Sequence, residues 1–534
     1  MTAAVVRAPK QKTQPTGRER PRPPRALSIA AMLAALLVLL PIAFTAWRAA
    51  TFGLSDAIDL LFRPLVGELF ANTVLITVSA TAASAVIGTA AAWFVERTML
   101  PGRRLWAGLM VAPLAMPPFI ASYAWVSLSL DLQDFAGALL VITSTYFPLV
   151  YLPVAAALRG MDPALEETAR SLGCGRRAIF LRVILPQLRP ALFGGMLLVA
   201  LGVMSEFGAF SLLRFRTFTT EIFAEYRTSF DGGGASMFAC VLIVVGLACI
   251  AFEHRVRGRA RYARVDRGTR RTASRYVLGH WRWPVVVCFA LLSIVTLGVP
   301  LGTIAYWLTQ HGAAAITPSE VSAASLLDAA KASVSLGLNA ALVTTALALP
   351  LAFLLVRYPG RFAMWLERIV LLAQGVPGLV IALALVSLAV HAAKPLYQTT
   401  TLLIAAYAAL FLPLALVSVR ASLLQMSPRL EEAARSLGLG TAPILGRVLL
   451  PLTRAGLGAA GTMVFISVVT ELNATLLLSP LDTQTLATQV WSDTASLAFA
   501  AAAPYAALLV GISLGASALL FTFLGRSIVA RADI

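Results

Sequence analysis

Residues 166–186 read EETARSLGCGRRAIFLRVILP, and residues 431–451 read EEAARSLGLGTAPILGRVLLP, so one polar stretch occurs twice in this chain. The second copy follows the first at a spacing of 265 positions, with no gap between the two registers. Each copy is a short charged island between long apolar runs. A helix-patterned polar segment that repeats at one register inside a very hydrophobic chain predicts two equivalent docking surfaces.

The composition around these islands is that of an integral membrane protein. Of 534 residues, 59% are hydrophobic and 13% are charged, which lies outside the range of soluble domains. The net charge of +18 comes from arginines in the gaps between apolar runs, which favours membrane topology over nucleic-acid binding. The cysteines form no C-x-x-C pair and the histidines are isolated, so we expect no disulfide framework and no stable metal site (Cys174, Cys240, Cys249, Cys288; His254, His280, His311, His391).

The apolar runs predict an all-α fold of about twelve transmembrane helices. A span of about 20 residues crosses roughly 30 Å of hydrocarbon, and such runs lie near 26–47, 71–95, 105–129, 136–158, 190–213, 235–253, 283–307, 330–356, 364–392, 400–419, 455–478 and 501–525. The basic residues 1–25 precede the first run and predict a disordered cytoplasmic tail. The run 26–47 is long enough to cross, and no small-residue cleavage site follows, so we interpret it as a helix and not as a signal peptide.

The charged loops alternate as the positive-inside rule requires. From a cytoplasmic start, the loop with Arg97, Arg103 and Arg104 falls inside, the loop with Asp131 and Asp134 falls outside, and both polar islands fall inside. Residues 255–282 hold ten arginines and one acid, and we interpret them as a basic cytoplasmic linker. Residues 527–534 then form a cytoplasmic tail. We call residues 159–189 the first polar loop and residues 420–454 the second polar loop.

The duplication extends beyond the polar loops. Arg97 followed by PGR at 101–103 resembles Arg357 followed by PGR at 359–361, and the run MPPFIASYAW from Met116 resembles VPGLVIALAL from Val376, at an offset near 260. The chain therefore divides into two halves, residues 26–254 and 283–526. Six crossings in each half give both halves the same orientation, which is a parallel repeat.

Local signals within each loop predict a short helix with a sharp end. Asp162-Pro163 and Ser427-Pro428 supply an N-cap and a proline at the first helical position. Gly173 and Gly438 supply the stop. In the two copies we expect the apolar side chains on one face and the charged ones on the polar side (Leu165, Ala169, Leu172 and Leu430, Ala434, Leu437; Glu166, Glu167, Arg170 and Glu431, Glu432, Arg435). A second short helix with Arg182 or Arg447 then reaches Pro186 or Pro451, where we expect the chain to turn back toward the bilayer.

These loops resemble a known motif. The spacing E-x-A-x-x-x-G, nine residues, then an aliphatic-x-L-P ending is similar to the EAA loop in permease subunits of type I ATP-binding-cassette importers; Thr168, Val183 and Val448 depart from it. The resemblance implies a bacterial inner-membrane permease with cytoplasmic termini, whose loops act as coupling helices on two copies of a cytoplasmic ATP-binding subunit. The simpler alternative is a pair of solvated surface helices whose charges keep the loops inside.

ATP chemistry is expected on that partner. The chain has no G-x-x-x-x-G-K-[ST] motif, so we expect no catalytic residue and no bound cofactor here. The run 456–461 matches G-x-G-x-x-G but opens a membrane helix with no preceding strand, so close helix packing explains it better.

Two acidic residues follow the polar loops in the same register of 265. Ser205-Glu206 aligns with Thr470-Glu471, and Asn473 follows. Glu206 is predicted about 16 residues into its helix, roughly 24 Å from the cytoplasmic end. A carboxylate at that depth is costly unless it faces the bundle interior or a wet cavity. These residues either line the translocation path, as a gate or transient oxygen ligands for a hard cation, or are structural.

The runs from Arg214, Glu471 and Ser479 resemble outer loops of ferric-iron permeases, which often fuse two permease units in one chain. That resemblance implies Fe(III) delivered by an extracytoplasmic binding protein. Fused permeases for thiamine, phosphonate or polyamine share much of this architecture and stay open as alternatives. Two other classes are an ion-coupled secondary transporter, disfavoured because the repeated charges lie mainly in cytoplasmic loops, and a membrane enzyme, for which no clustered catalytic constellation is found.

Overall fold

A computed structural model of the chain describes residues 23–227, 232–257, 275–310, 322–440 and 443–529. Helices dominate these residues, and the extended pairing found among them is an isolated parallel bridge between Thr98 and Tyr276. Most of the predicted N-terminal tail, the predicted C-terminal tail beyond 529 and residues 258–274 of the predicted linker lie outside the described ranges.

The helices of the first half follow the predicted order but with more interruptions than the apolar runs suggest. They are α1 (Arg25–Ala50), α2 (Leu54–Leu61), α3 (Pro64–Arg97), α4 (Arg103–Leu109), η1 (Ala112–Ala115), α5 (Pro118–Leu128), η2 (Leu130–Leu132), α6 (Phe135–Tyr146), α7 (Pro148–Gly160), α8 (Ala164–Ser171), α9 (Arg176–Ile179), η3 (Phe180–Ile184), α10 (Leu185–Ser205), α11 (Gly208–Leu212), α12 (Phe218–Arg227) and α13 (Gly232–Arg257).

The second half repeats this order. Its helices are η4 (Gly279–Trp281), α14 (Arg282–Ser293), η5 (Ile294–Gly298), α15 (Val299–Thr309), α16 (Ala323–Arg357), α17 (Arg361–Leu372), η7 (Ala373–Gly375), α18 (Gly378–Ala392), η8 (Lys394–Leu396), α19 (Thr400–Leu424), α20 (Pro428–Ser436), η9 (Ile444–Leu449), α22 (Leu450–Val469), α23 (Asn473–Leu478), α24 (Leu486–Ala495) and α25 (Phe499–Val529).

Two of the predicted straight spans are bent. Among the described residues ten helices are long and apolar enough to cross a membrane, and two further pairs, Arg103–Ala115 with Pro118–Leu128 and Arg361–Gly375 with Gly378–Ala392, bend by 91° and 106°. The bends fall at Met116-Pro117 and Val376-Pro377. Proline has no N–H to continue a helical ladder and disfavours helical backbone in the residue before it, and Met116 and Val376 are accordingly extended. The straight helices predicted at 105–129 and 364–392 were therefore wrong in shape.

Each bent pair nevertheless crosses the membrane once. Arg97 at the end of α3 forms an ion pair with Glu166 of α8, so the end of α3 and the first polar loop lie on the same side. Between them run the bent pair and the span Phe135–Gly160, and an even number of crossings is needed to return to that side. The Arg357–Glu431 pair imposes the same parity on the second half, which gives the predicted twelve crossings.

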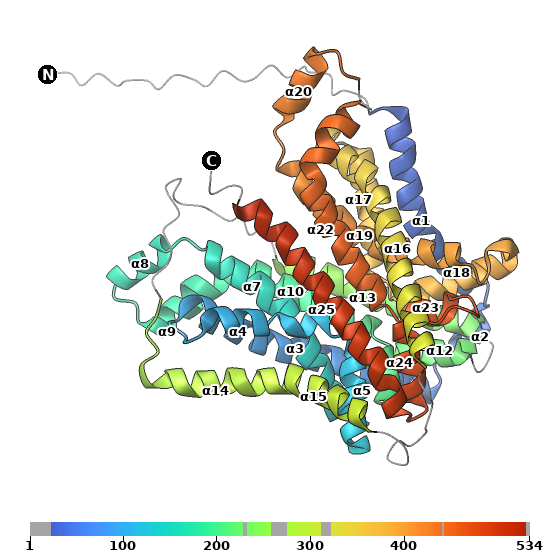
Figure 1. Cartoon of the computed structure of the whole chain (residues 1–534), viewed down its shortest axis with the longest axis horizontal. Coiled ribbons are helices and arrows are strands. Elements are labelled where there is room, and N and C mark those ends of the chain that lie inside the picture. Colours follow the sequence, from blue (N-terminus) through green and yellow to red (C-terminus); the bar gives the residue numbers. More distant parts are fainter. Residues whose placement is uncertain (1–22, 228–231, 258–274, 311–321, 441–442, 530–534) are drawn as a thin grey trace.

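The first helical segment of each half packs on the other half. α1 lies against α16, α17 and α18 of the second half in addition to α13 of its own, and α15 lies against α5 of the first half in addition to α25 of its own. Figure 1 shows α1 beside α16 and α17. A ring contact also joins the two halves, since the centroids of Trp106 in α4 and Phe289 in α14 lie 5.7 Å apart. Both hydrophobic cores therefore contain residues from both halves.

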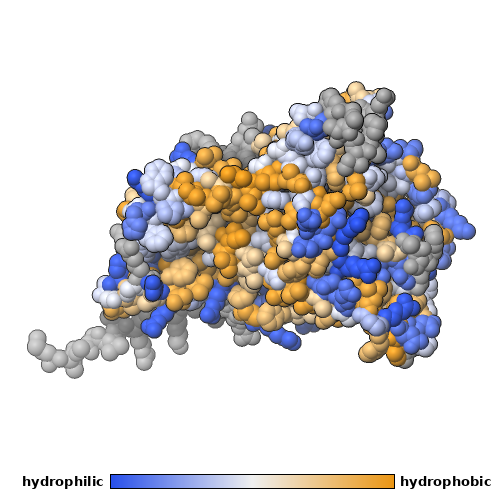
Figure 2. Space-filling view, turned by 90° about the horizontal axis from the view of Figure 1, so that it is seen from below, coloured by the Kyte–Doolittle hydropathy of each residue, from blue (hydrophilic) through white to orange (hydrophobic). Residues whose placement is uncertain are grey.

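The outer surface is suited to lipid. Large apolar side chains such as Val86 and Leu342 are 70% and 72% exposed, and Figure 2 shows a broad hydrophobic area across the face seen from below. In a bilayer these side chains meet acyl chains and not water, so their exposure carries no hydrophobic penalty. The chain is a multi-pass membrane protein.

Candidate functional site

The two polar loops form short helices, α8 and α20, at well separated points on the surface (Figure 1). In the second loop Ser427 caps the helix and Pro428 is its first residue, as predicted; the Ser427 hydroxyl accepts from Arg429 N at 3.4 Å. In the first loop the helix begins at Ala164, one residue later than predicted. The Asp162 carboxylate still accepts from Ala164 N at 3.0 Å, so the capping interaction is present in both copies.

Both helices end at the predicted glycines. Gly173 and Gly438 have φ values of +80° and +82°, in the left-handed region that glycine enters without steric cost. Cys174 N donates to Ala169 O at 3.0 Å, and Leu439 N donates to Ala434 O at 3.1 Å. This 6→1 bond closes a Schellman motif in each loop, so the two turns are copies in geometry as well as in sequence.

Glu166 and Glu431 are not on the solvated side of their helices, where the sequence pattern predicted them. Both are buried, and each forms an ion pair with the arginine that ends the preceding long helix, Arg97 of α3 and Arg357 of α16. A carboxylate is tolerated in such a place only when a paired charge compensates its desolvation. The repeat of Arg97 and Arg357 was visible in the sequence, but helical periodicity carries no information about a partner so far along the chain.

The predicted apolar face of each helix is split by the structure. Ala434 is buried, whereas Leu430 and Leu437 are 47% and 82% exposed; in the first loop Leu165 and Leu172 are 37% and 77% exposed. The small alanines face the protein and the leucines face outward. Glu167, Arg170, Glu432 and Arg435 are also exposed. Each loop therefore presents leucines flanked by charges, an unusual surface for a merely solvated helix.

The sequence predicts that the chain turns back toward the bilayer at Pro186 and Pro451, and this prediction is wrong. A π-helical turn, η3 or η9, leads directly into α10 or α22, and in the first loop Leu185 N bonds to Phe180 O across that turn. The i→i+5 bond adds one residue to the helical turn before the proline. The proline then lies in the first turn of the next helix, where its missing N–H costs little. Arg182 and Arg447 lie in these π turns.

Each predicted path glutamate lies at a break between a long helix and a short one. α10 ends at Ser205 before Glu206, and α22 ends at Val469 before Thr470 and Glu471, so the continuous helices predicted at 190–213 and 455–478 were wrong. Glu206 Oε1 accepts from Ala209 N at 2.9 Å, and Glu471 Oε1 accepts from Ala474 N at 3.1 Å. The carboxylates thereby cap α11 and α23, satisfying amides that the breaks would leave without partners.

The two breaks meet at the interface between the halves. Asn473 Nδ2 donates to Ser205 O at 3.3 Å, which joins the second break to the first. Ser205 and Thr470 also line the space there, although their hydroxyls bond back to Gly202 O and Ile466 O in their own helices. The structure therefore brings all five predicted path residues to one place.

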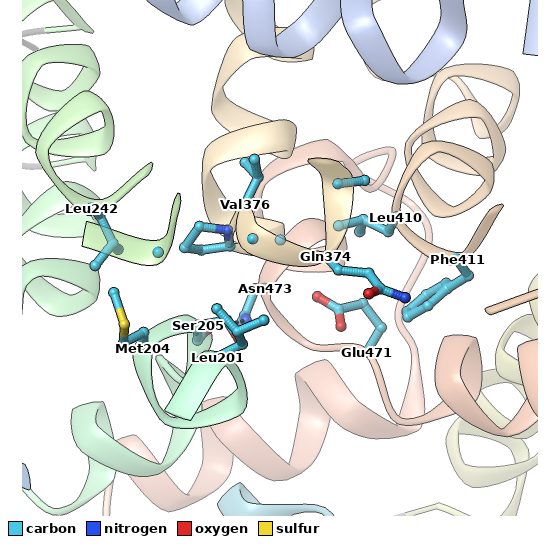
Figure 3. A pocket seen from close by; sticks show the side chains of 15 residues that line it. Leu201, Met204, Ser205, Leu242, Gln374, Val376, Leu410, Phe411, Glu471 and Asn473 are labelled. Atoms are coloured by element: carbon cyan, nitrogen blue, oxygen red, sulfur yellow. Dashed lines mark hydrogen bonds between the residues drawn. The ribbon is translucent and has the colours of Figure 1, made fainter. Parts of the chain in front are cut away.

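Two neighbouring cavities open at this interface. One of about 260 Å³ is lined by Glu206 and Glu471 together with the bend at 116–118. The other, of about 220 Å³, is lined by Glu471, Asn473 and the bend at 374–378; Figure 3 shows the side chains of Glu471 and Gln374 pointing into the same space. Ser205, Phe411, Glu471 and Asn473 line both. The bends, which sequence periodicity missed, thus form walls of the central site.

The surroundings of the two glutamates differ. Glu206 Oε2 accepts a further hydrogen bond from the Tyr146 hydroxyl at 3.0 Å. The residue 265 positions after Tyr146 is Phe411, which has no hydroxyl to donate. On the Glu471 side the backbone of the bend comes close to the carboxylate. A Cβ at Gly378 would lie only 3.1 Å from Glu471 Oε1, so glycine leaves room for this side chain. No group of three or more His, Cys, Asp or Glu side chains able to hold a metal occurs within the described ranges.

Twelve crossings in two parallel halves, paired polar loops and a central cavity define a membrane transport subunit of the two-unit permease kind. A family model described as "binding-protein-dependent transport system inner membrane component" matches residues 84–262 and 344–533. The chain belongs to this family, once in each half. It is a permease, the membrane subunit of an ATP-binding-cassette importer.

Curated relatives share this organisation to different extents. A protein of Haemophilus influenzae named "Fe(3+)-transport system permease protein FbpB 2" is 37% identical over 490 residues, which cover 92% of this chain and 96% of that protein. A "ferric transport system permease protein FbpB" of Actinobacillus pleuropneumoniae is 24% identical over 86% of this chain and 72% of its own length. The "sulfate transport system permease protein CysT" of Salmonella typhimurium is 27% identical over 41% of this chain but 87% of itself, as expected for a relative of single-unit size.

Proposed function

We propose that the permease imports ferric iron. The observation that carries this proposal is the 260 Å³ cavity between the halves, which two glutamates reach from symmetry-related helix breaks. Fe(III) is a hard cation, and carboxylate, amide and carbonyl oxygens are the ligands that suit it. The long relatives named as ferric permeases support the same cargo.

The cavity disfavours an oxyanion such as the cargo named for the sulfate permease relative. Two acidic side chains in a partly enclosed site would repel an anion, and the repulsion is stronger there than in water because the local dielectric is lower. The sulfate permease relative aligns with less than half of this chain, so its name constrains the cargo less than the full-length relatives do.

ATP is hydrolysed, in this proposal, by two copies of a cytoplasmic subunit, one seated on each polar loop. The outward leucines would enter an apolar groove, and Glu167, Arg170, Glu432 and Arg435 would contact its rim. Gly173 and Gly438 fix the turn after each helix, while Ala169, Ala434 and the buried Glu166 and Glu431 fasten the helix to the membrane part. A binding protein would deliver iron on the opposite, extracytoplasmic side.

Rigid attachment allows these loops to transmit force. Each short helix is held by a buried ion pair to a helix of more than 30 residues, α3 or α16. Approach of the two ATPases would therefore move whole halves against one another, which is a rigid-body transition. The path residues lie where the halves meet, so such a movement would open the cavity alternately to either side. Both termini are cytoplasmic in this arrangement.

Iron uptake by proteoliposomes that contain the complete transporter tests the cargo. We expect ATP-dependent uptake of radiolabelled iron presented by the binding protein, and loss of uptake when the catalytic residue of the ATPase is inactivated. The double substitution Glu206→Gln with Glu471→Gln should reduce uptake at least tenfold, because amides lose the charge that attracts the cation. Asp59→Asn, at an exposed position of α2 outside the runs that resemble ferric-permease loops, is the matched control.

Normal iron uptake by the double variant would favour a structural role for the two glutamates. Uptake of sulfate or molybdate in place of iron would overturn the proposed cargo while leaving the importer class intact. Uptake that persists without ATP hydrolysis would contradict the ATP-driven mechanism itself.

A further inference from the structure

The end of the linker is paired with the chain at the end of α3, beside the first polar loop. Tyr276 N donates to Arg97 O at 2.8 Å, and Met99 N donates to Tyr276 O at 3.0 Å, which together form the isolated bridge with Thr98. The Tyr276 ring stacks on Trp93 with centroids 5.8 Å apart and planes at 27°. The predicted linker between the halves is thus packed, at Tyr276, against the end of α3 next to α8.

The same tyrosine also holds the coupling helix itself. Arg170 Nη2 donates to the Tyr276 hydroxyl at 3.3 Å, and the Arg170 guanidinium lies 5.8 Å from the centre of the ring. Arg97 lies 5.9 Å from the centre of the Trp93 ring and pairs with Glu166. A continuous chain of side-chain contacts therefore leads from Glu166 through Arg97, Trp93 and Tyr276 to Arg170. Because Arg170 lies one helical turn after Glu166, both ends of this chain are on α8.

The second polar loop has the ion pair and an aromatic pair, but its described residues show no aromatic contact with Arg435. Phe353 stands where Trp93 stands in the first half, and its aromatic neighbour is Tyr358, the residue directly after Arg357, with centroids 6.2 Å apart. The corresponding position in the first half is Thr98. Arg435, the equivalent of Arg170, is exposed and has no ring contact within the described part of the chain. The first half takes from the linker an aromatic side chain that the second half supplies locally.

We propose that Tyr276 is a positioning residue of the first polar loop, which fastens α8 through Arg170 and makes the two loops unequal in coupling. This proposal rests on the coupling role given above to the loops. A cation–π contact and a hydrogen bond with a charged donor together favour one orientation of α8 on the order of tenfold. The second helix, α20, keeps its ion pair, its buried Ala434 and the backbone turn, but within the described residues it has no aromatic contact at Arg435 to match the one at Arg170.

The test uses the complete transporter in proteoliposomes and measures the amount of cargo imported per ATP hydrolysed. We expect Tyr276→Ala to lower this ratio roughly three- to tenfold, and Tyr276→Phe, which keeps the stack on Trp93, to lower it less. Val277→Ala is the matched control, because Val277 is the next residue and its side chain is 73% exposed. An unchanged ratio in Tyr276→Ala would overturn the proposal.

A second measurement reads the loop without any transport. Cys174 lies directly after Gly173, in the turn that ends α8. In a chain that keeps Cys174 as its single cysteine, Tyr276→Ala should accelerate maleimide labelling of Cys174 several-fold, whereas Val277→Ala should not. Equal labelling in all variants would show that Tyr276 does not fasten the loop. If the wild type transported no iron, the proposed cargo would fail, yet the labelling experiment would still decide this inference.

Discussion

The turn that ends each short helix depends on the backbone conformation of Gly173 or Gly438 and not on contacts with neighbouring atoms. A Cβ at either position would meet nothing within 4 Å, yet both residues have positive φ. A side chain there would be strained by its own backbone alone, at about 1–2 kcal/mol. The effect of a substitution at these two glycines can therefore be assigned to the turn and not to a clash.

We expect Gly173→Val to reduce import per ATP hydrolysed on the order of tenfold, because relief of the strain changes the direction in which α8 leaves its turn. The chain should still insert and purify with the ATPase. Gly175→Val is the control, since Gly175 also has open space around it but no positive φ. Equal losses in the two variants would show that bulk, and not backbone geometry, is what matters.

Residue-scale features were predictable where the cause is local in sequence. Capping by Ser427 and the turns at the two glycines depend on residues within a few positions of the helix ends, so the pattern of residues was sufficient to find them. The burial of Glu431 was not predictable in this way, because its partner Arg357 lies 74 residues away. The same holds for Tyr146, which distinguishes Glu206 from Glu471 and has no local signature.

At the scale of helices, close approach depends on glycines at particular faces. Gly195 of α10 packs so tightly on α7 that a Cβ would lie 2.8 Å from Val150 Cα and 2.9 Å from Leu149 O. Both of these are backbone atoms, which cannot move aside as a side-chain end can. Its neighbour Gly194 has nothing within 4 Å, so the two adjacent positions form a natural comparison.

Gly195→Val should therefore destabilise the protein by ~1–3 kcal/mol through overpacking, whereas Gly194→Val should have little effect. The unfolding temperature of the purified chain in detergent measures the difference. If both variants unfold at the wild-type temperature, α10 and α7 can separate without cost and the tight packing is not a stability determinant.

Helix existence was predicted better than helix shape. Apolar length alone located the crossings, because bilayer thickness imposes it. The breaks at Glu206 and Glu471 and the bends at Pro117 and Pro377 were missed, since hydropathy does not change where a helix is interrupted inside a protein. The polar and proline residues at those points were the available signal: irregular backbone within a membrane is tolerated only where it lines a cavity or is buried in protein.

At the scale of the whole molecule, the exchange of α1 and α15 between halves makes the two halves mutually dependent. α1 packs on α16 and α15 packs on α5, in addition to α13 and α25 of their own halves. Each half buries only part of its own first helix and needs the other half to cover the rest, so the two halves are held together by these helices as well as by the surfaces around the central cavity.

Two separate polypeptides, residues 1–257 and 275–534, should consequently assemble when they are produced together, and a tag on one should recover the other in detergent. Each polypeptide alone should aggregate or be degraded, because one core would lack α1 and the other α15. Recovery of either half as a stable, monodisperse species would contradict the exchange. This cut leaves Tyr276 attached to the second half, so the first polar loop would still receive its aromatic side chain.

The position of α1 also sets an order of events during synthesis. When the ribosome has completed α1, α16 (Ala323–Arg357), one of the second-half helices against which it finally packs, is still about 270 residues from being made. At roughly 5–20 residues per second, the face of α1 that packs on α16 must wait in the lipid or against a transient neighbour for some tens of seconds. The native core of the early half is therefore completed only after the later half has entered the membrane, and chains truncated before α16 cannot finish it.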